Sequence, residues 1–280
     1  MSIHFSCTRC GQCCHDLRLP LAVDEAAAWL ARGGAVQVFC DAIPWPAEPP
    51  GDPVLVRHRR QRSFAAHCGA LPVRVSVTLV AAFAGACPHL RADLTCGAYE
   101  QRPRVCRIYP AEVNPAVSLD PAAKACPPEA WAASQPVFQR AGTLVDAQTA
   151  DLIAQSRHAD AQDRMTKAYL CAELGYDRAA LANEGFVIYS PDRARLRAAL
   201  DTAREAASNA RVAGEDGGDG GNGIETSRDP RSPHAWRYVS NRSATLDTLR
   251  EIDADAERVG TQQAGDAFSY LGFFVEDAPG

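Results

Sequence analysis

"FSCTRCGQCCHDL" occupies residues 5–17 and places Cys7, Cys10, Cys13 and Cys14 within eight residues. Buried hydrophobes in a helix or a strand recur every 3.6 or 2 residues, whereas this run has a period of three and polar residues between its cysteines. Packing therefore does not account for the run. Two intervening residues let a tight turn direct two sulfur atoms at one centre, and Gly11 supplies the backbone freedom such a turn needs. The stretch predicts a loop that binds a metal or a metal cluster.

Four further cysteines follow after a long gap. They are Cys87, Cys96 and Cys106 in "CPHLRADLTCGAYEQRPRVCRIYP" and Cys126 in "KACPPEAW". One loop rarely supplies all the donors of a metal site, so we expect these distant cysteines to converge on the N-terminal run.

The N-terminal spacing is typical of iron-sulfur ligation. C-x2-C-x2-C matches the first three ligands of a bacterial ferredoxin-type run, whose fourth cysteine lies elsewhere and precedes a proline. Cys87 and Cys126 both precede a proline. Cys14 cannot easily share a centre with Cys13, because neighbouring side chains diverge. It therefore serves a second centre or stays a free thiolate.

Other thiols and imidazoles receive a simpler interpretation. Cys40, Cys68 and Cys171 stand outside the motif, and we expect each to be a small buried hydrophobe. His15 and His89 flank motif cysteines, but a hydrogen-bonded or exposed histidine is favoured over a ligand.

Composition excludes some partners. The chain has 280 residues, 46% hydrophobic and 22% charged, and a net charge of -5, so no overall basic field exists to hold nucleic acid or an anionic membrane. The arginine-rich "VLVRHRRQRS" is expected to be a solvated strand edge, not a nucleic-acid patch, because no aromatic residues are interleaved with it.

The expected compartment bears on the thiols. No basic leader with an apolar region is visible at the N-terminus, and the longest apolar stretch, residues 75–87, is well short of the roughly 20 residues that span a bilayer. We therefore expect a soluble, cytoplasmic protein with reduced thiols. That compartment favours metal binding or redox chemistry over a disulfide framework.

The motif as a whole resembles the YkgJ-type cysteine-cluster family, which is described as a zinc- or iron-chelating domain and often labelled an Fe-S oxidoreductase. Flagellin lysine N-methylases carry a similar cluster. The resemblance covers about the first 130 residues and departs from the family in a long insertion after Cys14 and in Gly97-Ala98. It implies a metal role for Cys7, Cys10, Cys13, Cys14, Cys87, Cys96 and Cys106, with Arg102, Arg107 and Tyr109 as supporting residues. Cys126 joins this predicted metal-binding set because it precedes a proline, as a remote fourth ligand does.

The arginines of "RPRVCR" have a predicted electrostatic role. Arg102, Arg104 and Arg107 surround Cys106 in the sequence. Cations near sulfur favour the thiolate that a metal requires. The alternative is a solvated turn in which the arginines pack on Tyr99 and Tyr109.

Outside the motif, regular structure is expected in several places. Residues 44–53 predict an irregular proline-rich connector, and residues 71–83 predict a strand or hairpin. A helix is expected from Ala147 to Leu174 with Gly175 as its C-cap, then a short strand and a helix with Ser190 as N-cap and Pro191 at the first helical position.

The C-terminal part follows a glycine-rich stretch, residues 214–223, which predicts a disordered linker. A last helix is expected over residues 243–259, and "FSYLGFF" is expected to dock on the main domain or on a partner.

We therefore expect an α+β chain, with a small irregular metal-stabilised cysteine-cluster domain that contains a short β hairpin, followed by a mainly helical region. The predicted ranges are 1–130 for the cluster domain with an insertion at about 40–75, 131–211 for the helical region, 212–233 for a disordered linker and 234–280 for a C-terminal helical segment.

Three classes of function fit this sequence. The first is an iron-sulfur protein whose cluster transfers electrons or supports the modification of a partner protein. The second is a structural zinc protein that acts as a binding module. The third is an enzyme like the flagellin methylases, which rests on the resemblance alone. The spacing favours a [4Fe-4S] cluster over zinc, because only one C-x2-C knuckle exists, and both over disulfides.

The sequence leaves open whether the chain is an enzyme, either an Fe-S oxidoreductase or a protein-modifying enzyme. The expected partner is a protein or an electron donor, with neither nucleic acid nor membrane among the partners.

Overall fold

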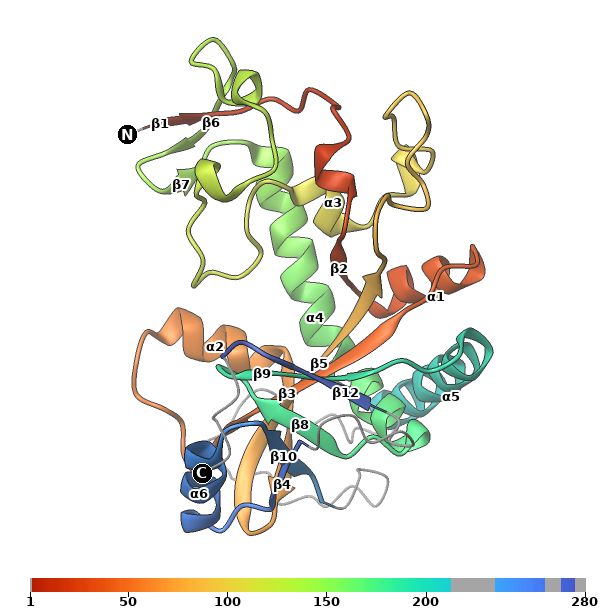
Figure 1. Ribbon diagram of the computed structural model, residues 1–280, viewed down its shortest axis with the longest axis vertical. Helices are drawn as coiled ribbons and strands as arrows, with labels where there is room; N and C mark the ends of the chain where they lie inside the picture. The colour runs from red at the N-terminus through yellow and green to blue at the C-terminus, as the bar shows by residue number, and fades with distance from the viewer. Residues whose placement is uncertain (1, 213–234, 260–267, 275–280) are drawn as a thin grey trace.

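The computed structural model describes residues 2–212, 235–259 and 268–274. A large mixed sheet occupies one end of the molecule, and an irregular region that carries the N-terminus occupies the other (Figure 1). A single long helix runs between the two ends (Figure 1). The predicted α+β class is confirmed.

The large sheet has nine strands. Its main path runs β11-β10-β8-β3-β5-β2, while β4 pairs with β5, and β9 pairs with β3 and β12. The longest pairing is the antiparallel one between β3 and β5, whose register runs from Gln37↔Val80 to Pro44↔Val73. The strands are β2 (Arg18–Leu21), β3 (Gln37–Pro44), β4 (Ser63–Cys68), β5 (Leu71–Ala82), β8 (Arg178–Leu181), β9 (Gly185–Tyr189), β10 (Arg237–Ser240), β11 (Ala256–Arg258) and β12 (Phe268–Gly272).

Strand β5 shows why the sheet forms where it does. Every second residue from Leu71 to Leu79 is a valine or leucine and is buried, so one face of the strand packs in the large core. The other face is less completely buried, with Ser76 and Thr78 partly exposed. The turn from β4 to β5 uses Gly69 at φ +60, where a Cβ atom would lie 2.6 Å from the Asp253 carbonyl oxygen. The positive φ and the nearby Asp253 carbonyl oxygen both exclude a side chain at this position. The predicted strand or hairpin at 71–83 is thus confirmed.

Six α-helices lie in the described residues: α1 (Val23–Ala31), α2 (Pro53–Gln61), α3 (Arg104–Ile108), α4 (Ala147–Leu174), α5 (Arg193–Val212) and α6 (Ser243–Glu251). The predicted helix at 147–174 is confirmed as α4. The Asp146 carboxylate caps it by accepting from the Thr149 amide at 2.7 Å, and Gly175 ends it at φ 71. At 1.5 Å per residue α4 is roughly 42 Å long.

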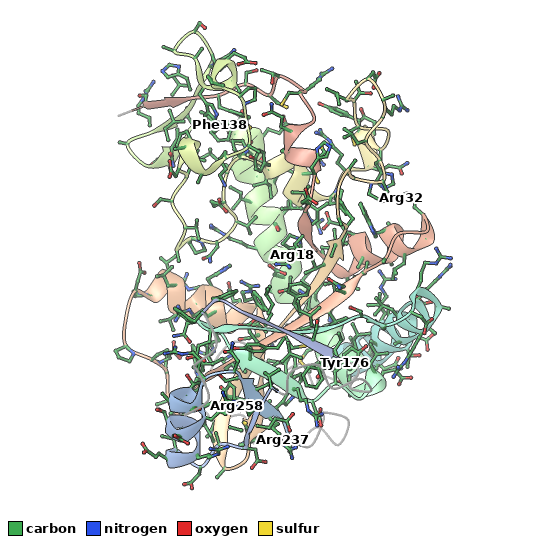
Figure 2. All side chains as sticks on the ribbon, viewed as in Figure 1. Arg18, Arg32, Phe138, Tyr176, Arg237 and Arg258 are labelled. Carbon is green, nitrogen blue, oxygen red and sulfur yellow. The ribbon has the colours of Figure 1, made fainter. Side chains whose placement is uncertain are left out.

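Two of the three hydrophobic clusters in the described residues lie at opposite ends of the molecule, where Figure 2 labels Phe138 and Tyr176. The third contains Phe39, Val80 and Ile188 of the main sheet. The large core joins the main sheet to α1, α4 and α5. The small core contains Phe5, Ala130 and Phe138 and lies beside a three-stranded sheet of β1 (Ser2–His4), β6 (Val137–Arg140) and β7 (Thr143–Leu144). A core this small stabilises little by itself.

The three cysteines outside the motif are buried as predicted. Cys40 and Cys171 are 0% exposed, and Cys68 is 1% exposed. The Cys68 thiol donates to the Asp255 carbonyl oxygen at 3.1 Å. All three belong to the large core.

The arginine-rich stretch after residue 53 was predicted as a strand edge, and that prediction is wrong. It forms α2, because the Asp52 carboxylate accepts from the Val54 amide at 2.8 Å and Pro53 takes the first helical position. The proline-rich segment before it is irregular, as expected.

Two helix ends also differ from prediction. Helix α5 begins at Arg193, later than Ser190 and Pro191 would place it, and the Asp192 carboxylate accepts from the Arg195 amide. The last helix ends at Glu251, because Asp253 adopts φ 57 and the chain then forms β11 beside β10.

"FSYLGFF" docks on the main sheet, where β12 pairs antiparallel with β9. The glycine-rich stretch at 214–223 lies outside the described residues. Strands from residues 37–82 and from residues 178–272 share one sheet, so the segment treated as an insertion builds the centre of that sheet. The division into domain ranges stays a prediction.

Asp41 of β3 gives the sheet a pH-dependent stability. Loss of hydration raises the pKa of its carboxyl to about 7, and Arg62 acts in the opposite direction. The unfolded carboxyl titrates near pH 3.9, so the stability that the protonated form contributes is present below that pH and is lost as the pH rises to about 7. Asp41→Asn should therefore be more stable than the parent protein at pH 8, by on the order of 2 kcal/mol.

Urea unfolding of both proteins at pH 4.5 and pH 8 measures this difference. Asp151→Asn, at an exposed position of α4, is the matched control and should not change with pH. A difference between Asp41→Asn and the parent that stays constant from pH 4.5 to pH 8 would contradict the prediction.

Candidate metal centre

The N-terminal cysteines are held by a tight 3-10 turn, η1 (Gln12–Cys14). Gly11 precedes it in the left-handed conformation at φ 72, and the Cys14 amide donates to the Gly11 carbonyl at 2.9 Å. A Cβ atom on Gly11 would lie 3.2 Å from the Leu94 Cβ. The glycine predicted to free the turn is thus required both by its φ and by the loop packed against it.

Adjacent cysteines in this turn point in different directions. A 3-10 turn has 3.0 residues per turn, so the side chains of Cys13 and Cys14 are separated by about 120°. Each of the two therefore faces a different set of remote residues.

Cys13 lies with Cys7, Cys10 and Cys126. Burial raises the pKa of the Cys13 thiol, a hydrogen bond from Cys14 lowers it, and the thiols of Cys126, Cys7 and Cys10 raise it further. Burial likewise raises the pKa of Cys126, as do Cys7 and Cys10. We call these four residues the first thiol group.

Main-chain contacts hold the first thiol group together. Strand β1 pairs with β6, and the Ser6 amide donates to the Ala130 carbonyl at 3.0 Å. These bonds hold Ser6, the residue before Cys7, next to the segment that follows Cys126. The Tyr109 hydroxyl accepts from the Ala125 amide at 2.9 Å and hydrogen-bonds to the Cys126 thiol.

Cys14 lies with Cys87, Cys96 and Cys106. Burial raises the pKa of Cys14 to about 12, with contributions from Cys13, Cys87 and Cys96. Burial also raises the pKa of Cys106 to about 12, together with Cys87, Cys14 and Cys13. We call Cys14, Cys87, Cys96 and Cys106 the second thiol group.

A folded loop brings the members of the second thiol group together. The Cys87 amide donates to the Cys14 carbonyl at 2.7 Å, so Cys87 is fixed directly beside the N-terminal turn. A bridge pairs Leu90 with Cys96, and the Gly97 amide donates to the His89 carbonyl at 2.6 Å. Electrostatic interactions thus connect all eight motif cysteines, mostly within each group, while Cys13 also hydrogen-bonds to Cys14 and acts on Cys106.

The predicted effect of the arginines on Cys106 is weak. Arg102 stacks 3.7 Å from the centre of the Tyr99 ring, and Arg104 turns away to pair with Asp24 and Glu25. Arg107 is exposed. Arg102 lowers the pKa of Cys106 less than burial and the neighbouring thiols raise it. Arg102 therefore packs on a tyrosine ring, as the alternative of a turn with stacked arginines predicts. The supporting roles of Arg102, Arg107 and Tyr109 stay predictions.

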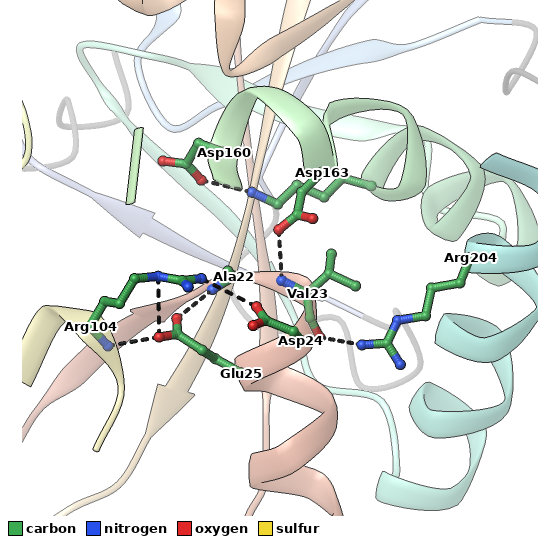
Figure 3. Close-up of polar contacts among 9 residues, drawn as sticks. Ala22, Val23, Asp24, Glu25, Arg104, Asp160, Asp163 and Arg204 are labelled. Carbon is green, nitrogen blue, oxygen red and sulfur yellow. Dashed lines mark hydrogen bonds and ion pairs between the residues drawn. The ribbon is translucent and has the colours of Figure 1, made fainter. Parts of the chain in front are cut away.

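Helix α3, which carries Cys106, is fixed by a residue that the sequence pattern did not reveal. The Glu25 carboxylate accepts from the Arg104 amide at 2.7 Å and from the Ala22 amide at 2.9 Å (Figure 3). It therefore joins the start of α1 to the start of α3. The only signal in the sequence is an acidic residue in the first turn of a helix, which is common and names no distant partner.

The histidines near the motif have structural partners. His15 is exposed, and its Nδ1 lies 3.2 Å from the Gly11 carbonyl oxygen. His89 packs edge-on against Trp29 at 5.0 Å, and burial lowers its pKa. Both agree with the prediction that they are hydrogen-bonded or partly exposed side chains.

The thiols lie near one another, but their sulfur atoms are not directed at one common centre. Across residues 2–212, 235–259 and 268–274, no three Cys, His, Asp or Glu side chains are arranged so that they could hold a metal ion as they stand. All eleven cysteines are free thiols. The assignment of individual cysteines as ligands stays a prediction.

Comparison with known proteins supports metal binding by this region. Residues 6–127 match the model of the CxxCxxCC family, described as a "putative zinc- or iron-chelating domain". The resemblance to a cysteine-cluster family is confirmed, and the match supports a metal-binding cysteine-cluster protein. Searches of curated proteins and of solved structures gave no match. Among the helices of the described segments, none is long and apolar enough to cross a membrane.

A pair of glycine variants tests the packing of the N-terminal turn. Gly11 and Gly85 have nearly the same φ, +72 and +73, but a Cβ on Gly85 would meet nothing within 4 Å. Alanine at either position costs about 1 to 2 kcal/mol for the left-handed backbone. Gly11→Ala should cost at least about 1 kcal/mol more, because its Cβ also crowds Leu94.

Urea unfolding and bound-metal analysis of both variants measure this difference. Only Gly11→Ala should lose metal along with stability. Equal losses of stability in the two variants would show that the contact with the loop at Leu94 is unimportant.

Proposed function

We propose that this chain is an iron-sulfur protein whose cysteine cluster transfers electrons or supports the modification of a partner protein. The observation that carries the proposal is the composition of the first thiol group. Cys7, Cys10 and Cys13 form the C-x2-C-x2-C run, and the electrostatic influence of Cys7, Cys10 and Cys126 on one another and on Cys13 supports a shared site. Cys126 precedes Pro127, which is the signature of the remote fourth ligand in a ferredoxin-type site.

The chemistry of the donors fits such a cluster. Each thiol group offers four sulfur atoms, and iron-sulfur clusters are held by four cysteine thiolates. Burial raises the pKa of Cys13 and Cys126, so these thiols need a nearby positive charge to ionise. The arginines do not supply it, whereas bound metal would. A cluster supplies one-electron transfer when it is bound.

The surrounding residues would orient the sulfur atoms. Tyr109 hydrogen-bonds to the Cys126 thiol and lowers its pKa, and hydrogen bonds to sulfur tune the potential of a cluster. Cys14 hydrogen-bonds to Cys13 and thereby connects the first group with the second.

The second thiol group supports a second centre. Cys14 interacts with Cys87, Cys96 and Cys106, so the thiol that seemed surplus in the N-terminal run has three partners besides Cys13. This group contains no C-x2-C knuckle. A structural zinc ion in this group is the alternative to a second cluster, since four thiolates suit tetrahedral zinc equally well.

Cysteine variants distinguish the two groups. In protein purified without air, we expect a brown chromophore with iron and inorganic sulfide that bleaches on oxidation. Cys13→Ser and Cys126→Ser should lose it. Cys14→Ser should keep most of the iron and lose a second metal instead, and Cys68→Ser, outside both groups, should keep both.

Iron, zinc and sulfide analysis together with the visible spectrum measures these outcomes. Stoichiometric zinc without sulfide or visible absorbance, in protein handled anaerobically throughout, would overturn the iron-sulfur proposal and favour a zinc-stabilised binding module. Equal loss of iron in Cys14→Ser and Cys13→Ser would contradict the division into two groups.

Metal should also stabilise the end of the molecule that contains the small core. Removal of metal by a chelator, or Cys10→Ser, should increase amide hydrogen exchange in β1, β6 and β7 and leave β3 and β5 largely protected. The reason is that Cys126 packs against the small core, whereas the main sheet, α4 and α5 form most of the large core, with Cys87 and Cys106 only partly buried against it. Equal exchange rates in the metal-bound and metal-free protein would argue against a structural role of the metal.

A further inference from the structure

The segment that leads to Cys126 contains a largely buried lysine. The chain has 29 lysines and arginines, but only Lys124 and Lys167 are lysines. The Lys124 side chain is 14% exposed, and its ammonium pairs with the Glu112 carboxylate, which is 29% exposed. Removing two such groups from water offsets much of their attraction, so the pair is weak evidence for stability. Its place two residues before a motif cysteine points instead to a role in the metal centre.

Tyr109 is the third member of this contact. The Lys124 ammonium lies 5.5 Å from the centre of the Tyr109 ring, within the range of a cation–π interaction. The hydroxyl of the same ring accepts from the Ala125 amide at 2.9 Å and hydrogen-bonds to the Cys126 thiol. We call Tyr109, Glu112 and Lys124 the clamp. It joins the chain just after α3 to the residues around Cys126.

Regular secondary structure does not fix the position of Cys126. Residues 109–127 are all described, and they contain one 3-10 turn, η3 (Pro121–Ala123), but no α-helix or β-strand. Cys126 is only partly buried against the small core, and its carbonyl accepts a long hydrogen bond of 3.4 Å from the Trp131 indole. Side-chain contacts such as those of the clamp must therefore hold this cysteine in place.

The charge of Lys124 also reaches the thiol. Burial raises the pKa of the Cys126 thiol, and Lys124 is among the groups that lower it. It does so although Glu112 pairs with its ammonium. A cation near sulfur favours the thiolate, which is the form that binds a metal. Lys124 thus acts on Cys126 both through the contacts of the clamp and through its charge.

We propose that Lys124 is a positioning residue and that the clamp holds the Cys126 thiol where it completes the first thiol group. This role rests on the proposed function, because it takes Cys126 to be a ligand, but it applies equally to an iron-sulfur cluster and to zinc. Contacts that orient metal ligands commonly contribute roughly ten- to a hundredfold to metal affinity. No clamp residue has to touch the metal for this effect.

Competition with a chelator tests this role in protein purified without air and in protein reloaded with zinc. The metal that Cys126→Ser lacks identifies the first thiol group. Lys124→Gln should bind that metal roughly tenfold more weakly than the parent, because Cys126 loses its support. Lys124→Arg keeps the charge and can still pair with Glu112, so it should bind nearly as well as the parent. Where the visible chromophore is present, Lys124→Gln should also shift its reduction potential to a more negative value, since a nearby positive charge favours the reduced cluster.

Lys167→Gln is the matched control. Lys167 is 3% exposed and pairs with Asp160 at 3.0 Å, but its helix, α4, carries no motif cysteine. This variant should lose stability in urea and keep the metal affinity and the potential of the parent. Glu112→Ala removes the partner of Lys124 and serves as a second variant in case Lys124→Gln does not fold. It should also weaken metal binding.

Metal affinity that is unchanged in both Lys124→Gln and Glu112→Ala would overturn the proposal. Equal weakening in Lys167→Gln or in Lys124→Arg would do the same, because it would show a loss of general stability or an effect unrelated to the charge and its pairing. Zinc without sulfide in the parent protein would overturn the iron-sulfur proposal, whereas the role of Lys124 would still be decided by the competition with the chelator.

Discussion

The arrangement of the cysteine region depends on one steric constraint, the divergence of two adjacent side chains. Cys13 and Cys14 are neighbours in a 3-10 turn, so their side chains leave the backbone in different directions, although their thiols hydrogen-bond to each other. The remaining motif cysteines therefore approach the turn from two sides. The segment around Cys126 arrives with β1 and β6, and the loop from Cys87 to Cys96 arrives through the bond between the Cys87 amide and the Cys14 carbonyl. The turn lies between them, and its sulfur atoms connect the two groups.

This turn is supported by contacts that belong to the rest of the molecule. Helix α3 brings Cys106 to the second thiol group, and Glu25 of α1 fixes the start of α3. Asp163 of α4 in turn accepts from the Val23 amide at the start of α1. A short series of hydrogen bonds thus leads from the long helix to a motif thiol. Because α4 also packs on the main sheet and on α5, the thiol groups share one framework with both.

The electrostatics of the region point to a need for bound cations. Eight thiols lie close together, and burial raises the pKa of the most enclosed among them, such as Cys14 and Cys106. Arginines near them in the sequence are used elsewhere: Arg102 stacks on Tyr99, and Arg104 pairs with acidic residues of α1. A metal or a cluster is then the natural source of positive charge for these sulfur atoms.

The sequence alone determined the local features. The left-handed glycine in the cysteine run, the helix that ends at Gly175 and the burial of Cys40, Cys68 and Cys171 all follow from preferences that act within a few residues or from hydrophobicity. The cysteine spacing also predicted the resemblance to a cysteine-cluster family, which the match over residues 6–127 supports. Two local predictions were wrong because an aspartate capped a helix at a position that the sequence analysis had not assigned as a cap. Asp52 capped a helix where a strand edge was expected, and Asp192 replaced Ser190 as the cap of α5.

Only the tertiary structure decided which cysteines lie together. Cys87 and Cys126 both precede a proline, so spacing could not say which of them joins Cys7, Cys10 and Cys13, whereas the pairing of β1 with β6 places Cys126 there. The same limit explains why residues 40–75 looked like an insertion. Strand β3 pairs with β8 and β9, which lie more than a hundred residues away, and hydrogen bonds between distant strands leave no local pattern in the sequence. Glu25 was missed for that reason too, because its partner on α3 comes into reach only when the chain is folded.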